Sequence, residues 1–354
     1  MGYIISGIQQ VGIGVSDAEQ AWTWYRKNFG MDVPVFKDSA TASLMTRYTG
    51  DRAEDRYAIL AMNMQGGGGF EIWQFTSRSP KKSEGQHLLG DTGVFAVKLK
   101  TQDIEAAFKR LKSNGVDLLN TIQQSPDGRK HFYVKDPFEN IFEIIESKSW
   151  FKKNGGAVTG GVAGCVIGVT DVDKALKLYR DVLGYSEVIY DGAKKQYSDF
   201  TGIPGGEGEF RRVILRSNKN RRGAFCRLLG DTELELVEVK DRTAHKMFRD
   251  RYWGDLGYIH ICFDINGMAN LADRCKQANF SFTVDSRDSF DMGKAAGHFS
   301  YCEDPDGTLI EFVETHKIPI IEKIGWYLNI KDRNPDKPLP DWMLGMLALN
   351  RVKD

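Results

Sequence analysis

The chain has 354 residues, enough for about two ordinary domains. Hydrophobic residues make up 41% and charged residues 27% of it, which is the balance of a soluble globular protein. Basic and acidic residues are equal in number, at 48 each, so the net charge supports neither a nucleic-acid partner nor a membrane-surface role. There is no apolar run long enough to span a bilayer and no signal-peptide pattern, and the five cysteines lack CxxC spacing. We therefore expect a cytoplasmic protein with reduced thiols.

The sequence repeats itself. Three pairs of segments match: residues 7–17 with 161–171, 90–93 with 254–257, and 136–137 with 304–305. The offset grows along the chain, from 161 − 7 = 154 through 254 − 90 = 164 to 304 − 136 = 168 residues. Growing offsets indicate insertions in loops, where chains tolerate them. The repeat predicts an N-terminal domain over residues 1–150 and a C-terminal domain over 151–320.

Each half divides again into two modules. The four modules span residues 5–76, 92–148, 160–240 and 255–316. Each opens with a strand, continues with an amphipathic helix that a glycine or a polar loop ends, and closes with further strands. In the first module Ser16 and Glu19 fit a capping box, and Gly30 ends the helix. The pattern predicts an α+β fold with a βαβββ plan used four times.

The closing strands and the tail complete the predicted elements. Strands are expected at residues 58–62, 70–75, 131–134, 141–145, 212–215 and 234–239. After the last module, residues 321–354 form a proline-containing tail with a short apolar helix from Asp341 to Leu349, which we expect to dock on the body.

The most informative stretch runs from Gly254 to Glu314. Its first strand alternates apolar and polar residues and carries His260, and its last strand places Glu311 between Ile310 and Phe312. A buried imidazole or carboxylate needs a partner, and a metal ion satisfies both. The pattern therefore indicates half of a metal site, with the remaining ligands supplied by another module.

This arrangement resembles the vicinal oxygen chelate superfamily, the group of glyoxalase I and the extradiol dioxygenases. The resemblance covers roughly residues 5–316 and is most specific at residues 11–25, 166–179 and 304–311. It implies that the four modules pair into two cupped mixed β-sheets with helices outside, and that one cup holds a divalent metal. Ligands in the family come from the first and last strands of each module.

Carried over to this chain, the resemblance marks eight positions. The four first-strand positions are Gln10, Ala96, Gly164 and His260, and the four last-strand positions are Glu71, Glu143, Glu235 and Glu311. Ala96 and Gly164 lack a ligand atom. If the first and fourth modules share a cup, the metal set is Gln10, Glu71, His260 and Glu311, as in some glyoxalase I enzymes. If the third and fourth share one, it is Glu235, His260 and Glu311. We favour the first pairing, because it gathers both capable first-strand residues into one site.

The resemblance implies a divalent-metal-dependent lyase or isomerase of the glyoxalase type. One Zn, Ni, Co, Mn or Fe ion would bind a small-molecule substrate and stabilise an enediolate, and Glu311 would move the carbon-bound proton. Lys294 and Arg212 are candidate substrate contacts. The protein is expected to be a monomer or homodimer.

Two alternatives remain open at this point. The first is an iron(II)-dependent extradiol or keto-acid dioxygenase with its site in the C-terminal half. The sequence has Gly164 where that class has a histidine, so His298 would have to substitute. The second is a metal-free protein that binds a small molecule. The other histidines, His87, His131, His245 and His316, are expected in exposed loops or at strand ends.

Overall fold

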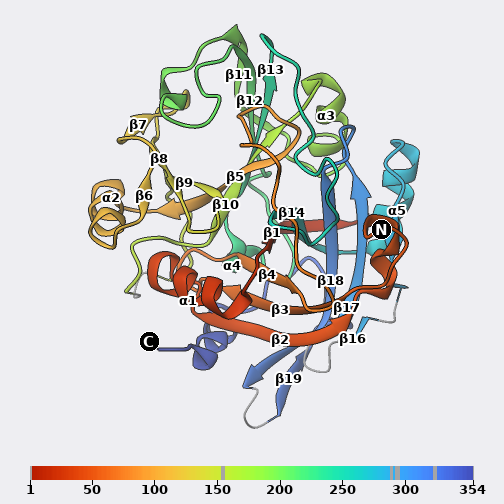
Figure 1. The fold of residues 1–354 in the computed structure, drawn as a ribbon. Coiled ribbons are helices and arrows are strands. Elements are labelled where there is room, and N and C mark those ends of the chain that lie inside the picture. The colour runs from red at the N-terminus through yellow and green to blue at the C-terminus, as the bar shows by residue number, and fades with distance from the viewer. Residues whose placement is uncertain (1, 153–155, 288–289, 292–295, 322–324, 354) are drawn as a thin grey trace.

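The computed structural model describes residues 2–152, 156–287, 290–291, 296–321 and 325–353. Four βαβββ modules form two curled mixed sheets, one of ten strands and one of nine, with the principal helices on the outside (Figure 1). The predicted fold class is confirmed.

The bounds of the elements follow the predicted plan. The ten-stranded sheet contains β1 (Ile4–Gly14), β2 (Val33–Thr41), β3 (Asp55–Met62), β4 (Gly69–Phe75), β14 (Gly257–Asn266), β15 (Val284–Asp285), β16 (Phe290–Asp291), β17 (Ala296–Glu303), β18 (Leu309–Ile321) and β19 (Trp326–Asn329). The nine-stranded sheet contains β5 (Gly93–Thr101), β6 (Asp117–Leu118), β7 (Gln123–Gln124), β8 (Lys130–Lys135), β9 (Ile141–Glu146), β10 (Val162–Gly168), β11 (Glu187–Lys195), β12 (Phe210–Arg216) and β13 (Glu233–Val239). The α-helices are α1 (Ala18–Phe29), α2 (Ile104–Ser113), α3 (Val172–Tyr179), α4 (Cys226–Leu229), α5 (Met268–Gln277) and α6 (Asp341–Met346).

The first and last quarters of the chain share one sheet. Strand β1 runs antiparallel to β14 along its length, and β4 and β18 flank this pair as parallel neighbours. In Figure 1 the red strand β1 of the first module therefore lies beside the teal strand β14 of the fourth, and the blue strand β18 follows on the far side of β14. The second and third modules form the other sheet through β5 and β10. The favoured pairing of the first module with the fourth is thus confirmed.

Strand periodicity decides what each sheet face does. On β14, Ile261 and Phe263 pack into the large apolar cluster that also holds the inner faces of α1, α2, α3 and α5. His260, one residue out of phase, faces the other way, because successive strand side chains alternate between faces. Helices α1, α2, α3 and α5 thus cover one face of their sheets, and His260 lies on the opposite, concave face.

Helix α1 begins one residue later than the capping-box prediction. Its N-cap is Asp17, whose carboxylate accepts a hydrogen bond from the Gln20 N–H at 2.9 Å. Ser16 therefore does not cap the helix, and Glu19 pairs instead with Lys37 at 2.7 Å. The Asp17 carboxylate is a strong acceptor at the positive end of the helix, which explains why it takes the cap. The predicted end at Gly30 is confirmed by its left-handed φ of 66°.

The C-terminal tail packs against the ten-stranded sheet. Its backbone is anchored where the Leu339 N–H donates to the Ala224 carbonyl at 2.8 Å. Leu344 of α6 and Leu347, which begins the short helix η5 (Leu347–Asn350), are buried in the apolar cluster on the concave face of this sheet. Trp342 remains exposed. None of the helices in the described ranges is long and apolar enough to cross a membrane.

Candidate metal centre

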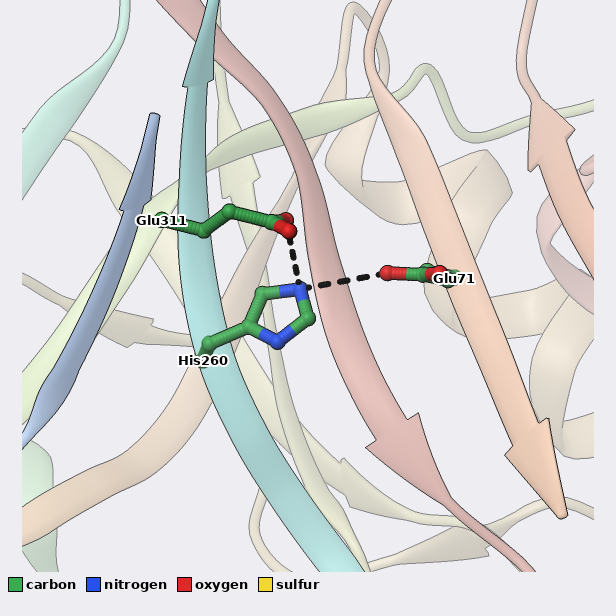
Figure 2. A group of neighbouring side chains, drawn as sticks. All are labelled: Glu71, His260 and Glu311. Carbon is green, nitrogen blue, oxygen red and sulfur yellow. Dashed lines mark ion pairs between the residues drawn. The ribbon is translucent and has the colours of Figure 1, made fainter. Parts of the chain in front are cut away.

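Three side chains from distant parts of the chain meet on the concave face of the ten-stranded sheet. Glu71 lies on β4, His260 on β14 and Glu311 on β18. His260 Nε2 is 3.1 Å from Glu311 Oε2 and 3.4 Å from Glu71 Oε2. One ligand atom from each residue lies within 4.8 Å of the others, and all three residues are buried. Figure 2 shows both carboxylates directed at the same imidazole nitrogen, so the three residues converge on one point.

Strand register explains this convergence. Gly12 on β1 is the backbone partner of Glu71 on one side and of His260 on the other. Glu71, Gly12 and His260 therefore form one row across three strands. Glu311 is the partner of Cys262, one step along the face from His260. Residues some 240 positions apart (311 − 71 = 240) thus become neighbours because the outer modules share a sheet.

Gly12 makes room for the imidazole. A Cβ atom at residue 12 would lie 2.5 Å from His260 Cε1 and 2.8 Å from both ring nitrogens. In the nine-stranded sheet the repeat places Val166 at the position of Gly12 and Ala96 at that of His260, and both pack in one apolar cluster. One sheet thus pairs a small residue on the first module's strand with a large one on the fourth's, and the other sheet pairs a large residue with a small one. We infer that residue 12 must be glycine because the imidazole of His260 occupies the space of its side chain.

Replacing Gly12 with alanine is expected to push the His260 ring out of the row. Since a metal ligand must be held in place by its surroundings, divalent metal affinity should fall by roughly 10- to 100-fold. Competitive titration against a chromophoric chelator measures this change. Gly85→Ala is the control, because nothing lies within 4 Å of a Cβ at residue 85. Equal affinities in the two variants would contradict this role of Gly12.

Gln10 lies beside the three residues. It is buried on β1, and its Nε2 donates to Glu71 Oε2 at 3.4 Å. Its Oε1 has no hydrogen-bond partner among the described residues. A buried amide oxygen left unpaired costs free energy, and coordination to a cation is one way to recover it. Gln10 is therefore placed to serve as the fourth donor of the set, through its amide oxygen.

The electrostatics of the group fit a divalent cation. Among the described residues, His260 Nε2 and Glu311 Oε2 are buried without a well-formed hydrogen bond. Burial disfavours the charged imidazole, but Glu311 and Glu71 outweigh it and raise the pKa of His260 to about 10. Burial likewise opposes the charge of Glu311, and His260 lowers its pKa nonetheless. Two buried carboxylates thus demand a positive charge at this point, and one imidazole with several oxygens suits Zn, Ni, Co, Mn or Fe.

Tyr301 is a residue of the site that sequence reasoning missed. Its hydroxyl lies 3.3 Å from His260 Nδ1, and its ring packs edge-on at 5.5 Å from the imidazole. It is the β17 partner of Glu311 and therefore shares the concave face. A contact at Nδ1 orients the ring and leaves Nε2 directed at the two carboxylates. Its place beside Glu311 follows from the register between β17 and β18, which the sequence pattern does not show.

A cavity opens above the three residues. Its volume is about 410 Å³, within the usual range of small-molecule sites. Gln10, Glu71 and Glu311 line its floor. Its walls are mainly apolar and aromatic, and they include Trp73 and Trp253, whose rings form a T-shaped pair at 4.3 Å. The candidate centre is therefore open to a small organic ligand.

Two of the predicted site residues lie in the other sheet. Arg212 and Glu235 are fully buried there, and Arg212 Nε contacts Glu235 Oε1 at 2.5 Å. Arg212 also binds Asp199, with 2.6 Å between Nη1 and Oδ2. The structure thus does not bring Glu235 to His260, and it gives the Arg212 guanidinium two carboxylate partners away from the cavity.

The remaining candidates do not join the group either. His298 lies on β17 with the opposite phase to Tyr301, so its side chain faces away from the cavity, and its Nε2 pairs with Asp285 Oδ1 at 2.5 Å. It therefore does not replace the missing histidine of the dioxygenase alternative at this centre. Lys294 lies outside the described residues.

In the nine-stranded sheet, a lysine stands where a metal would be expected. Lys98 Nζ lies 2.6 Å from Glu235, 2.8 Å from Glu233 and 3.3 Å from Glu143, all of them buried. The repeat makes Glu235 and Glu143 the counterparts of Glu71 and Glu311. Burial opposes the ammonium charge, but these carboxylates raise the pKa of Lys98 above its usual value. The first strands of this cup carry Ala96 and Gly164, which have no ligand atom. The carboxylates of its last strands are balanced by the Lys98 ammonium instead of a metal ion.

His131 belongs to the same network, so the prediction that it is exposed is wrong. Its side chain is fully buried, with Nδ1 2.8 Å from Glu143 Oε1. Strand β8 is covered on both faces, so a histidine on it needs partners inside the protein, and here they are carboxylates. Burial disfavours its charged form, but Glu143 and Asp199 outweigh it and raise the pKa of His131 to about 9.

This raised pKa sets a pH dependence of stability. Because the pKa of His131 is higher in the folded than in the unfolded protein, its protonation stabilises the fold. This contribution to the free energy of unfolding is complete below the ordinary pKa of 6.5 and is lost as the pH rises through about 9. The gap in unfolding free energy between the wild-type protein and His131→Gln should therefore shrink from pH 6.5 to pH 9. Urea unfolding of both proteins in chelator measures it, and His260 cancels because both proteins contain it. A gap independent of pH would contradict the charged state of His131.

Comparisons with known proteins agree with this fold. A family model described as the Glyoxalase/Bleomycin resistance protein/Dioxygenase superfamily matches residues 7–144 and 161–312, which is more than half of the chain. A search of the curated proteins finds no match.

Solved structures with the same architecture share little sequence. A candidate dioxygenase from Bacillus subtilis has a TM-score of 0.57 at 16% identity, covering 88% of this chain and 86% of that one. A glyoxalase I mutant from Zea mays has a TM-score of 0.53 at 14% identity, covering 87% and 93%. The unmutated Zea mays glyoxalase I has a TM-score of 0.50 at 14% identity, covering 87% and 92%. At such identities the likeness concerns the fold.

Proposed function

The chain belongs to the Glyoxalase/Bleomycin resistance protein/Dioxygenase superfamily, and on that premise we propose that it is a divalent-metal-dependent lyase or isomerase. Its substrate is a small molecule with two adjacent oxygens. Its metal ligands are Glu71, His260 and Glu311, with Gln10 as the fourth. One observation carries the proposal: a buried imidazole and two buried carboxylates, from the first and last quarters of the chain, converge within 4.8 Å at the floor of a cavity.

A divalent metal held by Glu71, His260, Glu311 and Gln10 would polarise a carbonyl oxygen and acidify the neighbouring C–H bond. The chain's own residues do the rest. Glu311 lines the cavity and accepts the carbon-bound proton, then returns it to the adjacent carbon. Tyr301 holds the His260 ring in place through Nδ1. The aromatic walls exclude water, which strengthens the interactions between charges inside the cavity.

The ligand set favours this reaction over the dioxygenase alternative. Non-haem iron oxygenases use two histidines and one carboxylate, whereas this centre gathers one histidine with two carboxylates and an amide. His298, the candidate second histidine, faces away from the cavity. Oxygen uptake in an iron-loaded sample would revive that alternative.

Proton exchange tests the proposed function directly. The protein is loaded with Zn, Ni or Mn and mixed in D₂O with 2-hydroxyacetophenone, a neutral hydroxyketone, and NMR follows the protons on the carbon beside the carbonyl. We expect exchange faster than in buffer, dependent on metal and removed by a chelator. Exchange at the buffer rate with every metal, in a sample shown to contain the ion, would overturn the proposal.

A further inference from the structure

We infer that the cavity selects uncharged, largely aromatic substrates, and that Asp38 enforces this choice by neutralising Arg56. The inference rests on the proposed function, because it concerns the molecule that occupies the same site. It follows from the composition of the cavity walls, the charge around the floor, and one ion pair at the wall.

The walls favour an aromatic ligand. Trp73 and Trp253 form a T-shaped pair, and Tyr301 meets Trp253 at 6.4 Å in a second perpendicular contact. Leu347, from the C-terminal tail, closes the cavity on another side. Flat apolar walls gain most from a flat apolar ligand, whose burial contributes roughly 25 cal/mol per Å² of contact.

The charges around the cavity favour a neutral ligand. Its described lining contains three carboxylates, those of Asp38, Glu71 and Glu311, and one cationic side chain, that of Arg56. A divalent metal on the floor brings this set to electrical neutrality. An anionic substrate would add uncompensated negative charge in a partly dry site, where charges interact more strongly than in water.

The single described cation of the lining is already engaged. Arg56 Nη1 lies 3.0 Å from the Asp38 carboxylate and donates to the Asp38 carbonyl at 2.7 Å. Its guanidinium also lies 5.2 Å from the centre of the Trp73 ring, and its side chain is only 8% exposed. A substrate carboxylate would have to break this pair before it could bind Arg56. This cost distinguishes the cavity from one built for an acidic conjugate such as a glutathione adduct.

Matched ligands test the inference. Quenching of tryptophan fluorescence in the Zn-loaded protein gives the Kd of 2-hydroxyacetophenone, which is neutral, and of phenylglyoxylate, which has similar size and carries one negative charge. S-benzylglutathione supplies the same ring on an acidic tripeptide. We expect the neutral ligand to bind at least tenfold more tightly than either anion. Tighter binding of phenylglyoxylate or S-benzylglutathione would overturn the inference.

Substitution of Asp38 tests the residue that sets the preference. Asp38→Asn removes the carboxylate paired with Arg56 and should increase phenylglyoxylate affinity at least fivefold while changing that of 2-hydroxyacetophenone less than twofold. Asp191→Asn is the control, because Asp191 neighbours Arg211 at 3.9 Å on the other sheet. Unchanged phenylglyoxylate affinity in Asp38→Asn, with Asp191→Asn also unchanged, would contradict the role of Asp38.

Metal content separates the two ways in which these experiments can fail. A protein that binds no metal refutes the proposed function, whatever the ligands do. A protein that binds metal but prefers the anions keeps the proposed function and refutes the selectivity. If the protein prefers the anions, Lys294→Met shows where the attracting charge lies. Loss of the anion preference in this variant would assign that charge to Lys294 and confirm that the inference fails.

Discussion

Replacement of Glu311 with glutamine is expected to abolish turnover while most of the metal remains bound. Glutamine keeps an oxygen at the same distance from the ion but cannot accept a proton at neutral pH. Loss of a positioned general base typically costs roughly 10²- to 10⁴-fold in rate. The measurement is the rate of proton exchange at saturating metal, together with the metal content of the same sample.

Glu71→Gln distinguishes a base from a ligand. Both glutamates contact His260 Nε2 and line the cavity, so the two variants change the same charge in the same surroundings. We expect Glu71→Gln, like Glu311→Gln, to keep most of its metal, but to retain activity once the metal site is filled. Glu311→Gln should stay inactive at any metal concentration. A fully active Glu311→Gln variant would end the assignment of the base.

Replacement of Lys98 with methionine should strongly destabilise the folded protein. It leaves three buried carboxylates, those of Glu143, Glu233 and Glu235, without their shared ammonium. Breaking a buried ion pair by removing one partner costs about 3–5 kcal/mol. Urea unfolding followed by circular dichroism measures the loss.

Lys100→Met is the matched control. Lys100 is equally buried, two residues along the same strand, but its amine donates to two backbone carbonyls, those of Gly66 and Leu229. Burial lowers the pKa of Lys100 to about 7, so it carries little of the charge that Lys98 carries. Its removal should cost about 1–3 kcal/mol. A loss for Lys98→Met no greater than for Lys100→Met would show that the network contributes little.

Much of the fold was predictable because the helical periodicity, the strand periodicity and the internal repeat all indicate four βαβββ modules. The matching segments define four modules, and strand alternation places His260 and Glu311 on a face away from the helices. The pairing of the outer modules was favoured only because Ala96 and Gly164 cannot bind metal. This pairing is produced by the contact between β1 and β14, and the sequence of either strand does not show which strand it will pair with.

Other features depend on register across strands, which local patterns do not contain. Gly12 matters because β1 and β14 place it opposite His260, and Tyr301 because β17 places it opposite Glu311. Lys98 is distinguished from other strand lysines by the three carboxylates around it, which come from β9 and β13. His131 was expected in solvent because its partners Glu143 and Asp199 lie on other segments of the chain, and the sequence around His131 does not indicate them.

Metal stoichiometry is the measurement that tests the central claim most directly. The wild-type protein and His260→Ala are stripped, reloaded with Zn or Ni, desalted and analysed for the element. His298→Ala, which removes a histidine of the same sheet that faces away from the cavity, serves as the control. We predict one tightly bound ion per chain in the wild-type protein and in His298→Ala, and none in His260→Ala. Equal metal content in wild type and His260→Ala, or no metal in the wild type, would contradict the account.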